Sequence, residues 1–148
     1  MSTGVLAGKR GLIMGVANDK SIAWGIAQSA AREGAELAFS YQGEVLEKRV
    51  RPLAEQVGAE MLTCDVTDDA SIDALFHALE EKWGKLDFVV HAIGFSNKDE
   101  LKGEYLNTSR ENFALTMDIS VYSFTAVAQR AARMMNEGGS LVTLTYQG

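Results

Sequence analysis

Residues 11–25 read GLIMGVANDKSIAWG, in which a short apolar run ends on a glycine and a segment with helical spacing follows. The apolar run, residues 11–15, predicts a buried strand. Residues 21–33 predict a helix, because their apolar positions recur at helical spacing and Gly34 provides a natural stop. The positions expected on the buried face of that helix are Ile22, Ile26, Ala30 and the neighbouring alanines. A strand that leads into a helix in this way predicts the opening of a βαβ unit.

The rest of the chain repeats this alternation of short apolar runs and longer amphipathic segments. Further strands are predicted at residues 36–41, 60–64, 88–92 and 140–146, and further helices at residues 44–57, 69–83 (with Asp68 as its cap) and 118–135. Alternating strands and helices build parallel sheets with right-handed crossovers, so the predicted fold class is α/β, a Rossmann-type doubly wound parallel sheet. The predicted strand order is 3-2-1-4-5, which places a ligand over the carboxyl ends of the strands, at the switch between strands 1 and 4.

Composition and charge narrow the class of protein. The chain has 148 residues, 47% of them hydrophobic, and a net charge of −6. Nucleic acid is not an expected partner, because phosphate binding needs a basic face. No apolar run approaches the roughly 18 residues of a membrane span, and residues 1–9 lack the apolar core of a signal peptide. The single cysteine, Cys64, excludes an internal disulfide framework, and together these observations predict a cytoplasmic protein with no membrane partner.

The turn between the first strand and the first helix is longer than the G-x-G-x-x-G motif of dinucleotide-binding proteins and keeps one glycine at the strand end. That residue, Gly15, still lets the backbone approach a ligand. The N-terminus of the following helix offers free amides and the positive end of its dipole to a pyrophosphate. Ser21, at the start of the helix, has two interpretations: it caps the helix, or it bonds a phosphate oxygen.

Two further strand ends carry polar residues suited to an adenosine. Gln42 follows the second strand, where NAD-binding proteins usually place an acidic residue on the ribose and NADP-binding proteins an arginine. It can accept from a ribose hydroxyl, and no lysine or arginine lies between Phe39 and Leu46, which favours NADH. Asp65 and Val66 follow the third strand, where the carboxylate can bond the adenine amino group and the valine can pack on the ring. The alternatives are an exposed glutamine and an aspartate that only starts the next turn.

The fourth strand ends in small residues. Ala92, Ile93 and Gly94 permit close approach of a flat cofactor. His91 is interpreted as a core histidine rather than a general base, because it follows an apolar run. Cys64 is interpreted as a small buried hydrophobe. Two isolated histidines and one cysteine give no metal-ligand spacing, so no metal site is predicted.

With these strand ends assembled, the whole chain resembles the bacterial type I enoyl-acyl carrier protein reductases, a divergent branch of the short-chain dehydrogenase/reductase family. The segments that carry the resemblance are Gly15-Val16-Ala17, residues 21–27, residues 34–39 with Tyr41-Gln42, Cys64-Asp65-Val66, residues 69–72, residues 91–95, residues 118–120 with 122–124, and Leu144-Thr145-Tyr146. The long first turn with Ser21-Ile22-Ala23 is specific to this branch, since ordinary members carry a more compact glycine motif there.

The resemblance implies hydride transfer from NADH to the β-carbon of a trans-2-enoyl thioester on acyl carrier protein, the last step of fatty-acid elongation. It implies the following site: Gly15, Ser21 and Ile22 at the pyrophosphate, Gln42 at the adenosine ribose, Asp65 and Val66 at the adenine, Ala92, Ile93 and Gly94 at the nicotinamide, and Ser96 where the substrate approaches. Tyr146 matches the first of two active-site tyrosines and is the predicted catalytic residue, because its hydroxyl can bond the charge that develops on the thioester oxygen. Relatives are usually homotetramers, built partly through the helix that begins near Asp118.

In the family, a second tyrosine and a lysine follow Tyr146, whereas this sequence ends at Gly148. We therefore expect residues 1–148 to be the N-terminal, dinucleotide-binding part of a single Rossmann-fold domain, and to be inactive by themselves. Two alternatives remain open. One is another short-chain dehydrogenase acting on alcohols or ketones, although residues 118–120 and 145–147 lack the asparagine and serine usual there. The other is a non-catalytic nucleotide-binding module or redox sensor.

Overall fold

The computed structural model describes residues 4–145, so Tyr146 lies outside the described residues. Within them the strands are β1 (Arg10–Met14), β2 (Glu36–Tyr41), β3 (Glu60–Thr63), β4 (Leu86–His91) and β5 (Met135–Thr143). The α-helices are α1 (Ile22–Arg32), α2 (Glu44–Val57), α3 (Asp69–Trp83), α4 (Arg110–Met117) and α5 (Ser123–Met134). A π-helical segment, η3 (Asp118–Tyr122), joins α4 to α5, and two 3₁₀ turns, η1 (Lys98–Glu100) and η2 (Tyr105–Asn107), precede α4.

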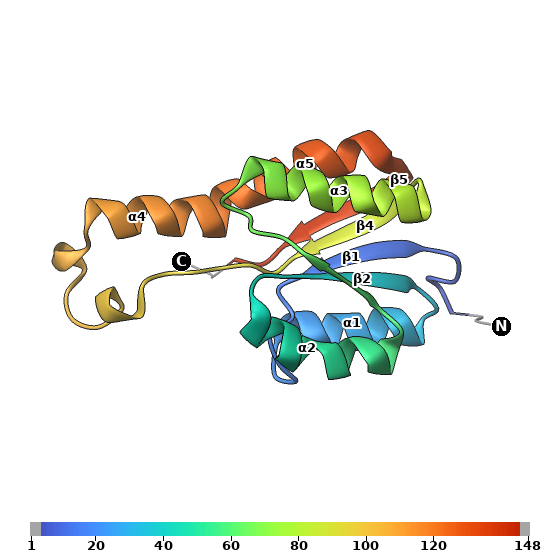
Figure 1. Cartoon of the computed structure of the whole chain (residues 1–148), viewed down its shortest axis with the longest axis horizontal. Helices are drawn as coiled ribbons and strands as arrows, with labels where there is room; N and C mark the ends of the chain where they lie inside the picture. Colours follow the sequence, from blue (N-terminus) through green and yellow to red (C-terminus); the bar gives the residue numbers. More distant parts are fainter. Residues whose placement is uncertain (1–3, 146–148) are drawn as a thin grey trace.

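The strands form one parallel sheet in the order β3-β2-β1-β4-β5, which confirms the fold class and the strand order predicted from the sequence. Helices α1 and α2 cover one face of the sheet, and α3 and α5 cover the other (Figure 1). This is the three-layer arrangement of a doubly wound fold, in which the loops that follow the strands gather at one edge of the sheet.

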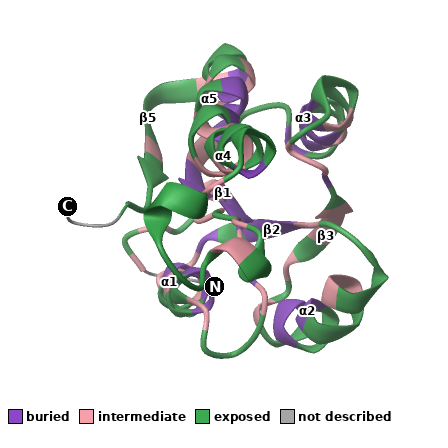
Figure 2. Cartoon of the chain, turned by 90° about the vertical axis from the view of Figure 1, so that its left-hand side faces the viewer, coloured by how far each residue is buried: buried purple, intermediate pink, exposed green. Residues whose placement is uncertain are grey.

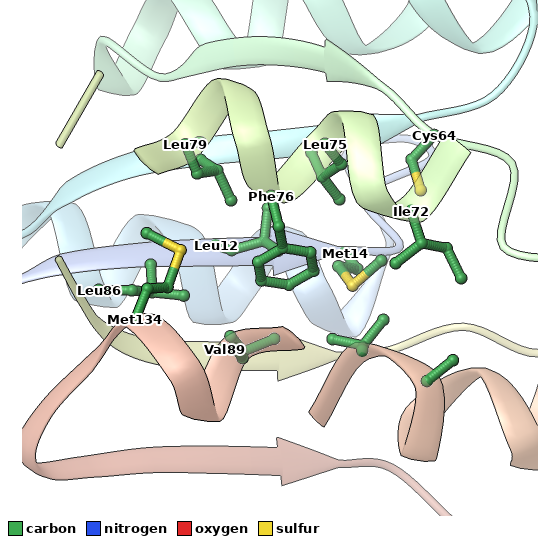
Figure 3. Packing of buried hydrophobic residues seen from close by; sticks show 14 of the residues in the cluster. Leu12, Met14, Cys64, Ile72, Leu75, Phe76, Leu79, Leu86, Val89 and Met134 are labelled. Carbon is green, nitrogen blue, oxygen red and sulfur yellow. The ribbon is translucent and has the colours of Figure 1, made fainter. Parts of the chain in front are cut away.

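Strand β1 contributes to the hydrophobic core on both faces of the sheet, because successive side chains of a strand point to opposite faces. Leu12 and Met14 pack with Ile72 and other residues of α3 and α5, in the cluster shown in Figure 3. Ile13 belongs to the cluster on the other face, together with Phe39. All three β1 side chains have no exposed surface, and each burial of this size stabilises the fold by roughly 1.5–3 kcal/mol.

The buried face of α1 differs from the prediction at one position. Ile22 is 69% exposed, whereas Trp24 and three alanines form the buried side of the helix. Ile26 and Ala30 pack against the core as predicted. The indole of Trp24 supplies the apolar surface expected of Ile22 and packs edge-on against Phe39, with the ring centroids 6.5 Å apart.

The fourth helical region begins earlier than the predicted residues 118–135. It begins at Arg110, where the Ser109 hydroxyl accepts the N–H of Asn112 as an N-cap, and it continues through η3 into α5. The π-helical segment interrupts the 3.6-residue spacing, and most apolar side chains of α4 are exposed (Figure 2), so no continuous buried stripe marks this helix in the sequence.

Strand β5 covers Met135–Thr143 rather than the predicted residues 140–146. Its glycine-containing start resembles a loop in the sequence, yet Leu86 pairs with Met135. After a register shift, Phe88 pairs with Ser140, and the regular ladder then continues to Thr143. The prediction therefore identified the regular part of the strand and misplaced both of its ends.

Candidate functional site

A cleft of about 270 Å³ lies at the carboxyl ends of β1, β2, β3 and β4. The predicted cofactor-binding residues that line it are Gly15, Gln42, Asp65, Val66, Ala92, Ile93 and Gly94. Phe95 and Ile119 also line it, and neither was identified from the sequence. Because parallel strands end at one edge of a sheet, residues far apart in the sequence meet in this cleft.

Gly15 is the residue that the geometry of the cleft constrains most. Its φ is +106°, in the region that favours glycine, and a Cβ at this position would lie 2.0 Å from the carbonyl oxygen of Ala92. The N–H of Ala92 in turn donates to the carbonyl of Met14, at 2.9 Å. The turn after β1 therefore lies directly against the end of β4, and only glycine allows this close approach.

Ser21 holds the turn that precedes α1. Its Oγ accepts the N–H groups of Ala17 and Asn18, at 3.0 and 3.1 Å. It occupies the N-cap position of α1, but its side chain makes no capping bond to that helix, so the capping interpretation is wrong for the hydroxyl. A hydroxyl that accepts two hydrogen bonds still has its own proton to donate. Neither Ser21 nor Ile22 lines the cleft.

Asp65 starts the turn after β3. Its Oδ1 accepts the N–H and the hydroxyl of Thr67, at 2.9 and 2.7 Å, and its carbonyl accepts the N–H of Asp68 at 3.1 Å. Its own N–H donates to the hydroxyl of Ser71, at 2.8 Å. The turn-forming interpretation is therefore confirmed. It does not compete with the adenine contact, which stays a prediction, because these side-chain bonds use Oδ1 and leave Oδ2.

The electrostatics of the cleft are simple. Gln42 is exposed there, and among the described residues that line the cleft Asp65 is the only charged one. No cation of the described lining is therefore available to neutralise a phosphate on the adenosine ribose. This agrees with the preference for NADH that the sequence predicts.

His91, at the end of β4, is fully buried. Its Nδ1 lies 2.8 Å from Thr143 Oγ1, and its Nε2 lies 2.7 Å from Ser123 Oγ. Because Ser123 donates its proton to the carbonyl of Ile119 at 2.6 Å, Nε2 carries the ring proton and Nδ1 accepts from Thr143. Burial lowers the pKa of His91 below its ordinary value. The core-histidine interpretation is thus confirmed.

Cys64 lines the cleft but is only 5% exposed. Burial raises the pKa of its thiol to about 11, so the thiolate is almost absent at neutral pH. Its interpretation as a small buried hydrophobe is confirmed. Within residues 4–145, no group of three or more His, Cys, Asp and Glu side chains is placed to hold a metal ion.

The predicted substrate-side residue, Ser96, does not line the cleft. Its hydroxyl oxygen accepts from Nδ2 of Asn112, at 3.1 Å. Asn112 is only 6% exposed, and sequence reasoning missed it because a polar residue on an otherwise exposed helix gives no sign of being buried. Tyr146, the predicted catalytic residue, lies outside the described residues.

A family model described as "Enoyl-(Acyl carrier protein) reductase" matches residues 15–148. The chain belongs to the enoyl-(acyl carrier protein) reductase family. Enoyl-[acyl-carrier-protein] reductase [NADH] 1 of Rhizobium meliloti is 68% identical over 99% of this chain and 54% of its own length. The chain therefore spans about half the length of the curated relatives of this reductase family that it matches.

Solved structures of the reductase family have the same fold as this chain. FabI from Candidatus Liberibacter asiaticus matches with a TM-score of 0.94 at 56% identity, over 99% of this chain and 57% of that one. The enoyl-(acyl-carrier-protein) reductase of Anaplasma phagocytophilum, solved in complex with NAD, matches with a TM-score of 0.92 at 53% identity, over the same shares. The Rossmann-type fold inferred from the sequence and the fold of these reductases agree.

Proposed function

We propose that the full-length protein reduces the trans-2 double bond of enoyl-acyl carrier protein thioesters with NADH, in fatty-acid biosynthesis. The observation that carries the proposal is the cleft itself. Residues from four strand ends, chosen from the sequence as cofactor contacts, line one cavity in a chain 68% identical to an NADH-dependent reductase.

The chain's own groups suit a dinucleotide pyrophosphate. Gly15 keeps the wall of the cleft free of a side chain, and the first turn of α1 has amides that no side chain caps. The hydroxyl proton of Ser21 is available to a phosphate oxygen, because its oxygen already accepts two N–H groups. In this proposal Ile22, which is exposed at the start of α1, adds its backbone amide.

The adenosine and nicotinamide ends occupy opposite sides of the cleft in this proposal. Gln42 accepts from the adenosine ribose, Asp65 Oδ2 accepts from the adenine amino group, and Val66 packs on the adenine ring. On the other side, the short backbone run Ala92, Ile93 and Gly94 lies against the nicotinamide. Gly94 leaves this part of the wall without a side chain.

Bound NADH supplies the hydride for the reduction. The role that we propose for Tyr146 is to donate a hydrogen bond to the thioester oxygen, where negative charge develops as the double bond is reduced. Ser96 lies on the side from which the acyl group approaches. By the family resemblance, a second tyrosine and a lysine of the full-length protein complete this end of the site.

Two surfaces suggest how the rest of the protein and its copies cover this part. A hollow of about 850 Å³ between α1 and β5 is lined by apolar side chains such as Ile26, Phe88 and Val142, and we propose that the remainder of the domain packs there.

The exposed apolar side chains of α4 and η3 include Phe113 and Val121, which are 52% and 53% exposed. We propose that these side chains pair copies of the protein within a homotetramer.

We place the reaction in the cytoplasm. Within residues 4–145 no helix is both long and apolar enough to cross a membrane.

The proposed reductase activity is tested with the full-length protein, by following NADH oxidation, and separately NADPH oxidation, with a trans-2-enoyl thioester. We expect turnover with NADH that depends on the thioester. Binding of NADH without any turnover would contradict the proposal and favour a binding module or a dehydrogenase with another substrate.

A further inference from the structure

The segment that follows β4 leaves the cleft alongside α4 (Figure 1). Phe95 is its last residue to line the cleft, so residues 96 and 97 form the rim just beyond the nicotinamide side. A flexible rim would have to be ordered each time a ligand binds, at a cost in conformational entropy. The described contacts show that this rim is already held in place.

The rim is held by Asn112, a residue of α4 that is 6% exposed. Its Oδ1 accepts the N–H of Asn97 at 3.0 Å and the hydroxyl of Thr116 at 3.4 Å. Its Nδ2 donates to Ser96 Oγ at 3.1 Å. A single buried amide thus fixes the backbone of one rim residue and the side chain of the other. Removing the amide would leave these groups without their partner.

A second side chain fixes the preceding residue independently. Ser120 of η3 accepts the N–H of Phe95 at 3.0 Å and donates to the carbonyl of the same residue at 3.2 Å. Phe95 therefore stays in the cleft wall through Ser120, whether or not Asn112 is present. The described hydrogen bonds of Asn112 reach no residue that lines the cleft, which separates its effect from the binding of the cofactor.

We propose that Asn112 is a positioning residue for the acyl substrate: by holding Ser96 and Asn97 against α4, it fixes the rim over which the enoyl thioester enters. The proposal rests on the proposed function. Asn112 touches neither cofactor nor reacting atoms in this proposal, and it acts through Ser96. Its loss should therefore weaken substrate capture more than it slows the reduction or weakens the binding of NADH.

The test uses steady-state kinetics of the full-length protein with a trans-2-enoyl thioester at saturating NADH. The variants are Asn112→Ala, Ser96→Ala and the double variant. Asn107→Ala is the matched control, because Asn107 is an exposed asparagine in the segment between β4 and α4. We expect Asn112→Ala to raise KM about fivefold to tenfold with a smaller change in kcat. The effect of the double variant should be smaller than the two single effects combined, because Asn112 acts partly through its hydrogen bond to Ser96. NADH affinity and the control variant should stay within about twofold of the wild type.

Three outcomes would overturn the role of Asn112. The first is a KM within about twofold of the wild type for both single variants. The second is an equal loss in kcat, in NADH affinity and in KM, which a merely structural role produces. The third applies if Asn112→Ala fails to fold: Ser96→Ala then decides, and its unchanged KM overturns the role. A wild type that turns over while the variants match it rejects this role alone, whereas a wild type without turnover rejects the proposed function as well.

Discussion

The carbonyl oxygen of Ala92 lies where residue 15 would place a side chain: a Cβ on Gly15 would be 2.0 Å away from it. This relationship joins the end of β1 to the end of β4. It brings the backbone of the first turn against the backbone at the end of β4, and it explains why residue 15 is a glycine.

Gly15→Ala should lower both stability and cofactor affinity. The substitution adds a strained positive φ to a collision with backbone, so we expect a loss of roughly 3 kcal/mol or more in the free energy of unfolding. Denaturant unfolding and a fluorescence titration with NADH measure the two effects in the full-length protein. Gly58→Ala is the matched control: its φ is +66° with no atom near its Cβ, so it should cost only about 1 kcal/mol. Equal losses for the two variants would show that the collision with Ala92 does not occur.

The stability of the protein should fall as the pH drops below about 6.5, partly because of His91. Burial lowers the pKa of His91 in the folded state, so below the unfolded pKa the unfolded chain binds a proton that the folded chain does not. The contribution of His91 to the free energy of unfolding is complete above the pKa that His91 has in the unfolded chain. It is lost as the pH falls below that value, at up to about 1.4 kcal/mol per pH unit. Unfolding measured from pH 8 to pH 5 should show a shallower loss for His91→Gln, which keeps hydrogen-bonding groups without titrating. Parallel profiles for the two proteins would contradict this assignment.

Cys64 should resist alkylation in the native protein. Its thiol has a pKa raised to about 11 by burial and is 5% exposed, so little thiolate forms and access is poor. Iodoacetamide at pH 8 followed by intact mass measurement should show labelling of this position only after the protein is unfolded. Complete labelling of native protein on the timescale of the unfolded control would mean that the cleft opens at Cys64.

Gln42→Arg should shift the cofactor preference toward NADPH. The cleft has no cation in its described lining, and an arginine at this position can pair with a phosphate on the adenosine ribose. We expect the ratio of NADPH to NADH affinity to rise about tenfold or more, in titrations with both cofactors. Gln42→Met, similar in length and uncharged, controls for loss of the amide. A ratio that stays at the wild-type value in the arginine variant would place the adenosine ribose away from Gln42.

The sequence predicted the features of the fold that leave a pattern of side chains, and it missed those that depend on backbone geometry or on distant segments. The strands followed from apolar runs such as that of Arg10–Met14, which is buried between two layers of helices. Their order followed from the alternation of strands and helices with right-handed crossovers. The cleft followed because strand ends converge, which brought Gly15, Gln42 and Asp65 together. The π-helical segment Asp118–Tyr122 was missed, because its backbone hydrogen bonding leaves no side-chain pattern. Asn112 was missed because its burial arises from the loop that folds over it.

The most direct test of the proposed cofactor site is a crystal structure of the full-length protein with NADH. We expect density for the dinucleotide across the carboxyl ends of β1 to β4, with the adenine at Asp65 and Val66 and the nicotinamide at Ala92 to Gly94. NADH bound outside this cleft, or no bound NADH at a saturating concentration, would contradict it.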